Sequence, residues 1–242
     1  MHFQGDIDSI KDLYIRIRNM TKEEKEQKAL AKLEAERARI ETMKEFEYKF
    51  AECRFICGID EVGRGPFAGP VVAGAVILPK DEEILYLNDS KKLSEKKREE
   101  LYDIILDKAV AVGLGMESSE VIDEINIKQA TLRAMRKAIE NLKNPKTGEK
   151  YVPDMLLVDA EHIPDIGIRQ VGIVKGDAKS ISIAAASIFA KVTRDRMMVE
   201  YDKIYPGYDF SGNKGYGTAA HIAAIKELGM TPIHRRSFVH LK

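Results

Sequence analysis

From Phe55 onward, short apolar runs rich in β-branched residues alternate with longer stretches whose apolar residues have helical spacing. The strand-like runs cover residues 55–60, 70–79, 109–116, 154–160 and 168–174. The helical patterns cover residues 94–109, 120–142, about 180–205 and 218–229. A hairpin-like pair of strands comes first, and helices and strands then alternate. This order predicts one α/β domain with a mixed β-sheet flanked by helices.

Residues 1–52 have a different character. Apolar residues fall at helical spacing from Ile10 to Met20, and the sequence Thr21-Lys22-Glu23-Glu24 has the form of a capping box. The stretch after it is rich in Ala, Glu, Lys and Arg, with a thin apolar stripe from Leu30 to Met43. We therefore expect two helices that form an amino-terminal extension over 1–52, ahead of a catalytic domain over 53–242. The pattern leaves open whether this arm binds a partner or packs on the domain.

The net charge of the whole chain gives little information about partners, whereas the distribution of charge along the chain gives more. Lys plus Arg and Asp plus Glu both number 39, but residues 169–242 contain 12 basic and 6 acidic residues. That local excess suits a phosphate-bearing partner, and it is equally compatible with a solvated basic surface.

Cysteine content and hydropathy bear on the compartment. Cys53 and Cys57 are the two cysteines of the chain, too few for a disulfide framework or a cysteine zinc cluster, which indicates a reducing compartment. The sequence contains no run of about 18 apolar residues, and its start lacks the pattern of a signal peptide. We expect a cytoplasmic protein with no membrane segment, and a monomer by default.

Acidic residues end three of the predicted strands. Asp60 and Glu61 follow the first apolar run, Asp159 ends the run Met155–Val158, and Asp177 follows the last short run. Ligand sites in open α/β sheets favour such strand ends. Each acid alone could instead be a turn residue or a helix cap, and Asp177 could cap the long helix that follows it.

A cluster of carboxylates requires positive charge, because each one raises the pKa of its neighbours. With only oxygen ligands, and no Cys or His nearby, the expected ion is hard, Mg²⁺ or Mn²⁺. Mg²⁺ commonly completes its coordination with substrate phosphates, so a phosphodiester substrate is expected.

The turn after the first acids is the stretch Gly63-Arg64-Gly65 in "GIDEVGRGPFAGP". Glycines allow close approach of a ligand to bare backbone groups, although a plain structural turn before Pro66 explains them equally well. Lys91 lies just before a helix that Ser94 can cap, a place suited to phosphate contact.

Further candidates lie in the last third of the chain. Lys179 flanks Asp177, Ser180 begins the long helix and could bind phosphate there, and Lys191 and Arg194 add positive charge along that helix. Tyr216, between two glycines, could stack on a base or a sugar, or could cover an edge of the core.

At these residues the sequence resembles the ribonuclease HII (type 2 ribonuclease H) family. The resemblance covers roughly 56–238 and includes, in the order of the family, "GIDEVGRGPFAGPVVAGAVIL", "NDSKKLSEKKRE", "LLVDA", "KGDAKSISIAAASIFAKVTRDRMM", "GYGT" and "HRRSF". The arm resembles the amino-terminal extension of some bacterial members.

The resemblance implies a ribonuclease H-like fold. It also implies hydrolysis of the RNA strand in RNA–DNA hybrids and cleavage 5′ to single ribonucleotides in duplex DNA, which serves ribonucleotide removal. By motif, Asp60, Glu61, Asp159 and Asp177 match the four acidic residues of the family's active site, which holds two metal ions. The turn 63–65 and Tyr216 match the elements that recognise the ribonucleotide and its junction with DNA.

Two other functions stay open at this stage. Another two-metal nuclease with the same fold, such as a junction resolvase, would cut all-DNA substrates. A binding module without catalysis would hold hybrids through its basic last third, and the four intact acids argue against it.

Overall fold

The computed structural model describes residues 21–240, and its centre is a five-stranded mixed sheet with the strand order β3-β2-β1-β4-β5. The strands are β1 (Ile56–Val62), β2 (Val71–Ile77), β3 (Ala111–Glu117), β4 (Met155–Asp159) and β5 (Arg169–Ile173). Strands β1, β2 and β3 pair antiparallel, whereas β4 is parallel to both β1 and β5. The mixed sheet and all five strands expected from the sequence are confirmed.

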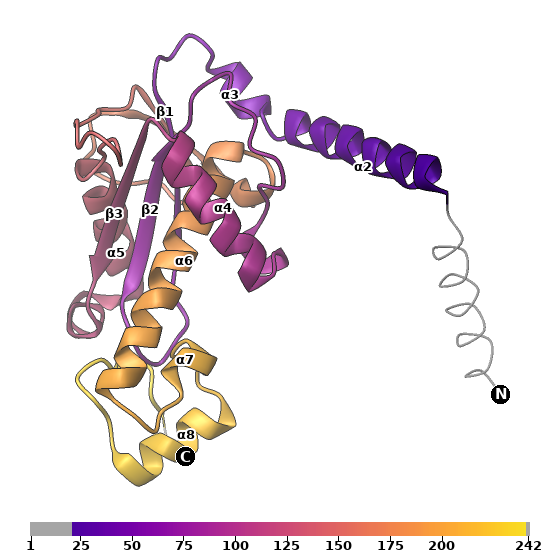
Figure 1. The fold of residues 1–242 in the computed structure, drawn as a ribbon. Coiled ribbons are helices and arrows are strands. Elements are labelled where there is room, and N and C mark those ends of the chain that lie inside the picture. Colours follow the sequence, from indigo (N-terminus) through magenta and orange to yellow (C-terminus); the bar gives the residue numbers. More distant parts are fainter. Residues whose placement is uncertain (1–20, 241–242) are drawn as a thin grey trace, which may run out of the picture.

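Helices cover both faces of this sheet (Figure 1). The helix α5 (Ser119–Glu140) packs on β2 and β3, and α6 (Ile181–Ile204) packs on β1 and β2 from the other side. The helix α4 (Glu95–Lys108) lies against α6, and α7 (Phe210–Asn213) and α8 (Ala219–Leu228) follow near the carboxyl end. Across residues 21–240, none of the helices is long and apolar enough to cross a membrane.

The helices α4 and α6 each begin directly after a serine whose hydroxyl caps the first turn. The hydroxyl of Ser94 accepts a hydrogen bond from the N–H of Lys97 at the start of α4, as expected. The long helix is capped by Ser180, whose hydroxyl accepts from the N–H of Ile183, and not by Asp177. Asp177 itself lies in a short 3₁₀ turn, η2 (Gly176–Ala178), and its carboxylate is therefore not committed to a helix cap.

The helix α5 contains a break that the spacing of its apolar residues did not reveal. Asn126 has φ of 64° and ψ of 163°, so the helix is interrupted there. Its side-chain oxygen accepts hydrogen bonds from the N–H groups of Lys128 and Gln129, which caps the second half of the helix. Asn tolerates positive φ better than other non-glycine residues, and its apolar neighbours keep helical spacing on both sides, which hides the break in the sequence.

The arm is helical where it is described. The capping box at Thr21 and Glu24 is present and begins α2 (Lys22–Thr42), and a short helix α3 (Glu45–Lys49) follows. The first half of α2 is exposed and stands away from the sheet (Figure 1), whereas Ile40 and Met43 are buried against the core. The first predicted arm helix, Ile10 to Met20, lies outside the described residues.

The carboxyl end of α2 also holds the loop that leads to η1 (Ser90–Lys92). Arg39 pairs with Glu36 and donates a 2.7 Å hydrogen bond to the carbonyl of Leu87, while Glu36 accepts one from the N–H of Tyr86. The part of the arm nearest the domain therefore packs on it. The division of the chain into 1–52 and 53–242 remains a prediction.

Two substitutions in α2 separate the packed part of the arm from the exposed part. Ile40→Ala should lower the free energy of unfolding by about 2–4 kcal/mol, since it empties a site in the core. Leu30→Ala removes a side chain that is 56% exposed and should change it by less than about 0.5 kcal/mol. Urea unfolding measures both, and equal effects would contradict the packing of α2 on the core.

Candidate active site

The candidate acids meet at the carboxyl edge of the parallel strands. In the β1–β4 pair Ile59 lies opposite Val158, so the residues that follow them, Asp60 and Asp159, are neighbours across the two strands. The adjacent strand β5 ends at Ile173, a few residues before Asp177. The topology therefore brings acids that are distant in the sequence to one edge of the sheet.

Asp60 is the most deeply buried of these acids, with 6% of its surface exposed. One of its oxygens accepts a 2.7 Å hydrogen bond from the N–H of Glu61. Burial raises the pKa of the Asp60 carboxyl well above its usual range, and the charges of Glu61 and Asp159 raise it further. A hydrogen bond from Ser187 on α6 opposes this shift.

Glu61 is the second-last residue of β1, and 13% of its side chain is exposed. Burial raises the pKa of its carboxyl, although the Arg64 guanidinium, 3.4 Å from its Oε1, opposes the shift. The other oxygen, Oε2, is buried and has no hydrogen-bond partner. An unpaired buried carboxylate oxygen is unfavourable, and it marks a place where a cation would be stabilised.

Asp159 and Asp177 extend the cluster beyond β1. Burial raises the pKa of the Asp177 carboxyl, the charges of Asp89 and Asp159 add to the effect, and Lys91 opposes it. Asp159 uses one oxygen to accept a 2.7 Å hydrogen bond from the N–H of Gly176. The acids are thus close enough to influence one another, and positive charge is in short supply among them.

A cavity of about 310 Å³ opens beside Asp60 and Glu61. Most of the predicted substrate-binding residues line it together with these two acids. The lining residues are Asp60, Glu61, Val62, Gly63, Arg64, Gly65, Ser90, Lys91, Ser187, Lys191 and Tyr216.

The two glycines of the turn differ in what the fold requires of them. Gly63 has φ of +89°, and a Cβ there would lie 2.3 Å from Nε of Arg194, so the fold itself requires glycine. A Cβ on Gly65 would meet only the ring of Tyr216, at 3.7 Å, which is ordinary contact. Packing therefore does not explain why residue 65 is a glycine. Its bare backbone faces Tyr216, which is half-exposed.

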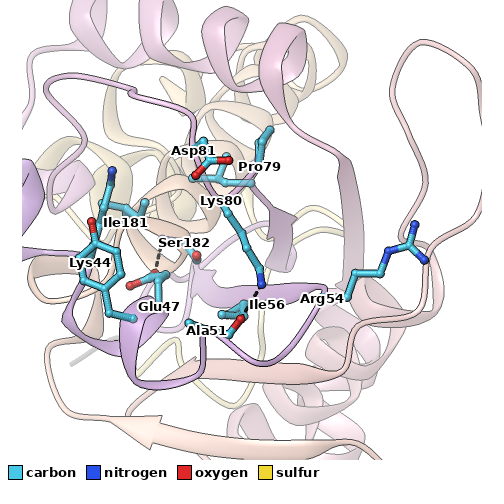
Figure 2. A pocket seen from close by; sticks show the side chains of 12 residues that line it. Lys44, Glu47, Ala51, Arg54, Ile56, Pro79, Lys80, Asp81, Ile181 and Ser182 are labelled. Carbon is cyan, nitrogen blue, oxygen red and sulfur yellow. Dashed lines mark hydrogen bonds between the residues drawn. The ribbon is translucent and has the colours of Figure 1, made fainter.

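Two predicted substrate-binding residues lie elsewhere. Lys179 is exposed between η2 and α6 and does not line the cavity. Ser180 is fully buried, and its hydroxyl donates a 2.6 Å hydrogen bond to Glu47 of the arm. Figure 2 shows a separate pocket at this junction, where Glu47 also accepts from the N–H of Ser182. In this structure Ser180 is accordingly not available to a phosphate.

Three residues around the site were not identified from the sequence. Asp89 and Glu161 add negative charge, and Ser187 contacts Asp60. Lys191, a candidate from the sequence, lines the cavity and pairs with Asp195 at 2.7 Å. Ser187, Lys191 and Asp195 recur every four residues on α6, and this polar row is the signal that could have revealed Ser187.

The donor set fits a hard divalent cation, since it consists of carboxylate oxygens. Across residues 21–240, no three side chains already converge with the spacing of ligands around a single ion. Asp60 and Asp159 instead each direct an oxygen at a backbone N–H. The unpaired oxygen of Glu61 and the raised carboxyl pKa values nevertheless fit residues that hold such an ion.

The sequence has close relatives among known proteins. A family model, ribonuclease HII, matches residues 57–241. The chain is 64% identical over 208 residues to the ribonuclease HII of Lachnoclostridium phytofermentans, and the match covers 86% of this chain and 79% of that protein.

Solved structures agree with the fold. Ribonuclease H2 from Pyrococcus horikoshii OT3 is similar with a TM-score of 0.62 and 25% identity, over 76% of this chain and 93% of that one. Ribonuclease HII from Archaeoglobus fulgidus, in a structure of its complex with PCNA, is similar with a TM-score of 0.61 and 25% identity. That match covers 78% of this chain and 96% of that one.

Because the carboxylate cluster has too little positive charge around it, a divalent cation that binds there should stabilise the folded protein. Mg²⁺ or Mn²⁺ at about 100 times its Kd should raise the free energy of unfolding by about 2.7 kcal/mol, through binding to the folded state. Asp60→Asn should abolish most of that gain. With chelator, however, the variant should be at least as stable as the original, because it removes a buried like charge. Urea unfolding with ion and with chelator measures both effects, and an undiminished gain in Asp60→Asn would contradict the assignment.

Proposed function

Because the chain belongs to the ribonuclease HII family, whose members are metal-dependent endoribonucleases, we propose that Asp60, Glu61, Asp159 and Asp177 hold its catalytic divalent ions. The protein is an endoribonuclease that hydrolyses the RNA strand of RNA–DNA hybrids and cuts beside single ribonucleotides in duplex DNA. The observation that supports the assignment is one cavity that Asp60 and Glu61 share with the turn 63–65 and Tyr216. Asp159 and Asp177 do not line this cavity; the charge of Asp159 raises the pKa of both Asp60 and Asp177, which connects the four acids.

The acids have different parts in this proposal. Asp60, Glu61 and Asp159 bind metal directly, and Asp177, at the outer side of the cluster, completes the site and assists water or product release. We infer Mg²⁺ or Mn²⁺ from the oxygen-only donor set. A pair of such ions, held by these carboxylates, would supply an activated water and would stabilise the departing 3′ oxygen, giving 5′-phosphate and 3′-hydroxyl ends.

Recognition of RNA depends on the 2′-hydroxyl, since this group distinguishes a ribonucleotide from a deoxynucleotide whatever the base. In the proposal, the bare backbone of Gly65 and its neighbours contacts that hydroxyl, and Tyr216 packs on the sugar of the next, deoxy, residue. Lys91, which lines the cavity, contacts a phosphate. A cytoplasmic monomer remains the working expectation.

The main test is Asp159→Asn. The change should lower kcat by orders of magnitude and leave folding intact, because the lost interaction acts mainly in the transition state. Cleavage of a duplex with one embedded ribonucleotide measures this, with Mg²⁺, Mn²⁺ or chelator. Near-normal turnover by the variant would contradict the role of Asp159. Cleavage of the all-deoxy twin by the unchanged protein would favour a junction nuclease instead.

The two glycines of the turn provide a second test. Gly65→Ala should leave the free energy of unfolding nearly unchanged and lower kcat/KM on the ribonucleotide duplex, since the new methyl group occupies space intended for the substrate. Gly63→Ala should instead destabilise the fold by more than about 1 kcal/mol, because of its positive φ and its contact with Arg194. Urea unfolding measures the stability of both variants, and steady-state kinetics measures their activity. Full activity of Gly65→Ala would contradict the proposal that the substrate contacts the backbone of Gly65.

A further inference from the structure

Residues 63–70, which contain the recognition turn, fold around two buried guanidinium groups. Arg194 of α6 and Arg235 near the carboxyl end are both fully buried. Each is held by backbone carbonyls and not by a carboxylate. Charged side chains are seldom buried in this way, and the arrangement requires the carbonyl dipoles to keep fixed positions.

Arg235 donates hydrogen bonds to the backbone carbonyls of the turn itself. Its Nη2 donates to the carbonyl of Gly63 at 2.6 Å, and its Nη1 donates to that of Arg64 at 3.0 Å. The same guanidinium donates twice to the carbonyl of Gly69, at 2.7 and 3.0 Å. One side chain thus fixes both ends of the loop.

Arg194 joins this loop to the segment that carries the tyrosine. It donates to the carbonyls of Ala68 and Pro70 at 3.1 and 2.9 Å, and to that of Lys214 at 2.9 Å, two residues before Tyr216. Burial lowers the pKa of Arg194 to about 10 and that of Arg235 to about 9, so both stay protonated at neutral pH. The turn and the tyrosine loop therefore form one unit around two cations.

The peptide units of the turn connect these contacts to the cavity. In a trans peptide the C=O and N–H point in opposite directions, and the described chain has no cis peptide. The carbonyls of Gly63 and Arg64 face Arg235, so the N–H groups of the same peptide units, which belong to Arg64 and Gly65, point away from it. Arg64 and Gly65 line the cavity.

We propose that Arg235 is a positioning residue for ribonucleotide recognition, which acts by holding two peptide units of the turn with their N–H groups directed at the substrate. The guanidinium also polarises these peptide units, and this makes the two N–H groups stronger donors to an oxygen acceptor such as the 2′-hydroxyl. The inference depends on the proposed function, because it assigns a purpose to the turn of that same site.

The test compares two duplexes that differ in one hydroxyl group. The full chain is titrated, with chelator to prevent cleavage, with duplex DNA containing one ribonucleotide and with its all-deoxy twin. Arg235→Ala should reduce the preference for the ribonucleotide duplex by roughly 10- to 100-fold, or to unity where the original preference is smaller. Affinity for the all-deoxy twin should stay the same. General misfolding would lower both affinities together.

Three controls make the result specific. Arg236→Ala removes the exposed side chain next along the chain and should leave the preference unchanged. Low millimolar guanidinium chloride should partly restore the preference of Arg235→Ala by entering the vacated site, whereas sodium chloride at equal ionic strength should not. Arg235→Lys keeps the positive charge but loses the planar guanidinium, which donates to several carbonyls at once. Its preference for the ribonucleotide duplex should lie between that of Arg235→Ala and that of the original protein.

A measurement on the unchanged protein covers the case in which Arg235→Ala does not fold. The amide proton resonances of Arg64 and Gly65 should shift downfield on binding the ribonucleotide duplex, and less on binding the all-deoxy twin. An unaltered preference in Arg235→Ala, or identical shifts with both duplexes, would overturn the inference. If the original protein shows no preference and no cleavage of the ribonucleotide duplex, the proposed function itself fails.

Discussion

The repulsion among carboxylates at one edge of the sheet is the constraint on which the rest of the site depends. Parallel pairing of β1 with β4 makes Asp60 and Asp159 neighbours, and the burial of Asp60 removes the water that would screen its charge. The surrounding cations compensate only in part, as the raised carboxyl pKa values indicate. The fold tolerates this because the sheet is held by large apolar clusters on both faces. In the proposed function, a bound divalent ion would supply stability that the protein does not provide by itself.

Positive charge is arranged around these acids in two distinct ways. Arg64, Lys91 and Lys191 lie at the cavity, where they can meet phosphate groups or the acids themselves. Arg194 and Arg235 lie behind the turn, surrounded by carbonyls. The first set offers charge to a ligand directly, and the second fixes the backbone that a ligand meets. Arg194 was named from the sequence as a source of positive charge, as were Arg64, Lys91 and Lys191, but the burial of Arg194 and Arg235 behind the turn was not expected.

Most of the fold could be predicted because the strands are β-branched apolar runs and the helix starts carry their own caps, as at Thr21 and Ser94. The break at Asn126 could not, because the apolar spacing continues through it. The acids were found as ends of strands, but Asp89 belongs to a loop and gave no such signal. From the sequence Arg194 was expected to add positive charge along its helix. Its full burial could not be predicted, because it depends on carbonyls from loops distant in sequence.

The parallel pairing of β1 and β4 has a consequence for synthesis of the chain. The strand that carries Asp60 is made early, whereas β4, with Asp159, follows only after β2, β3, α4 and α5. Contacts between segments so far apart in the chain form late in folding. A nascent polypeptide on the ribosome, surrounded by messenger and ribosomal RNA, therefore lacks two of the four proposed metal-binding acids, Asp159 and Asp177, until most of its length has emerged.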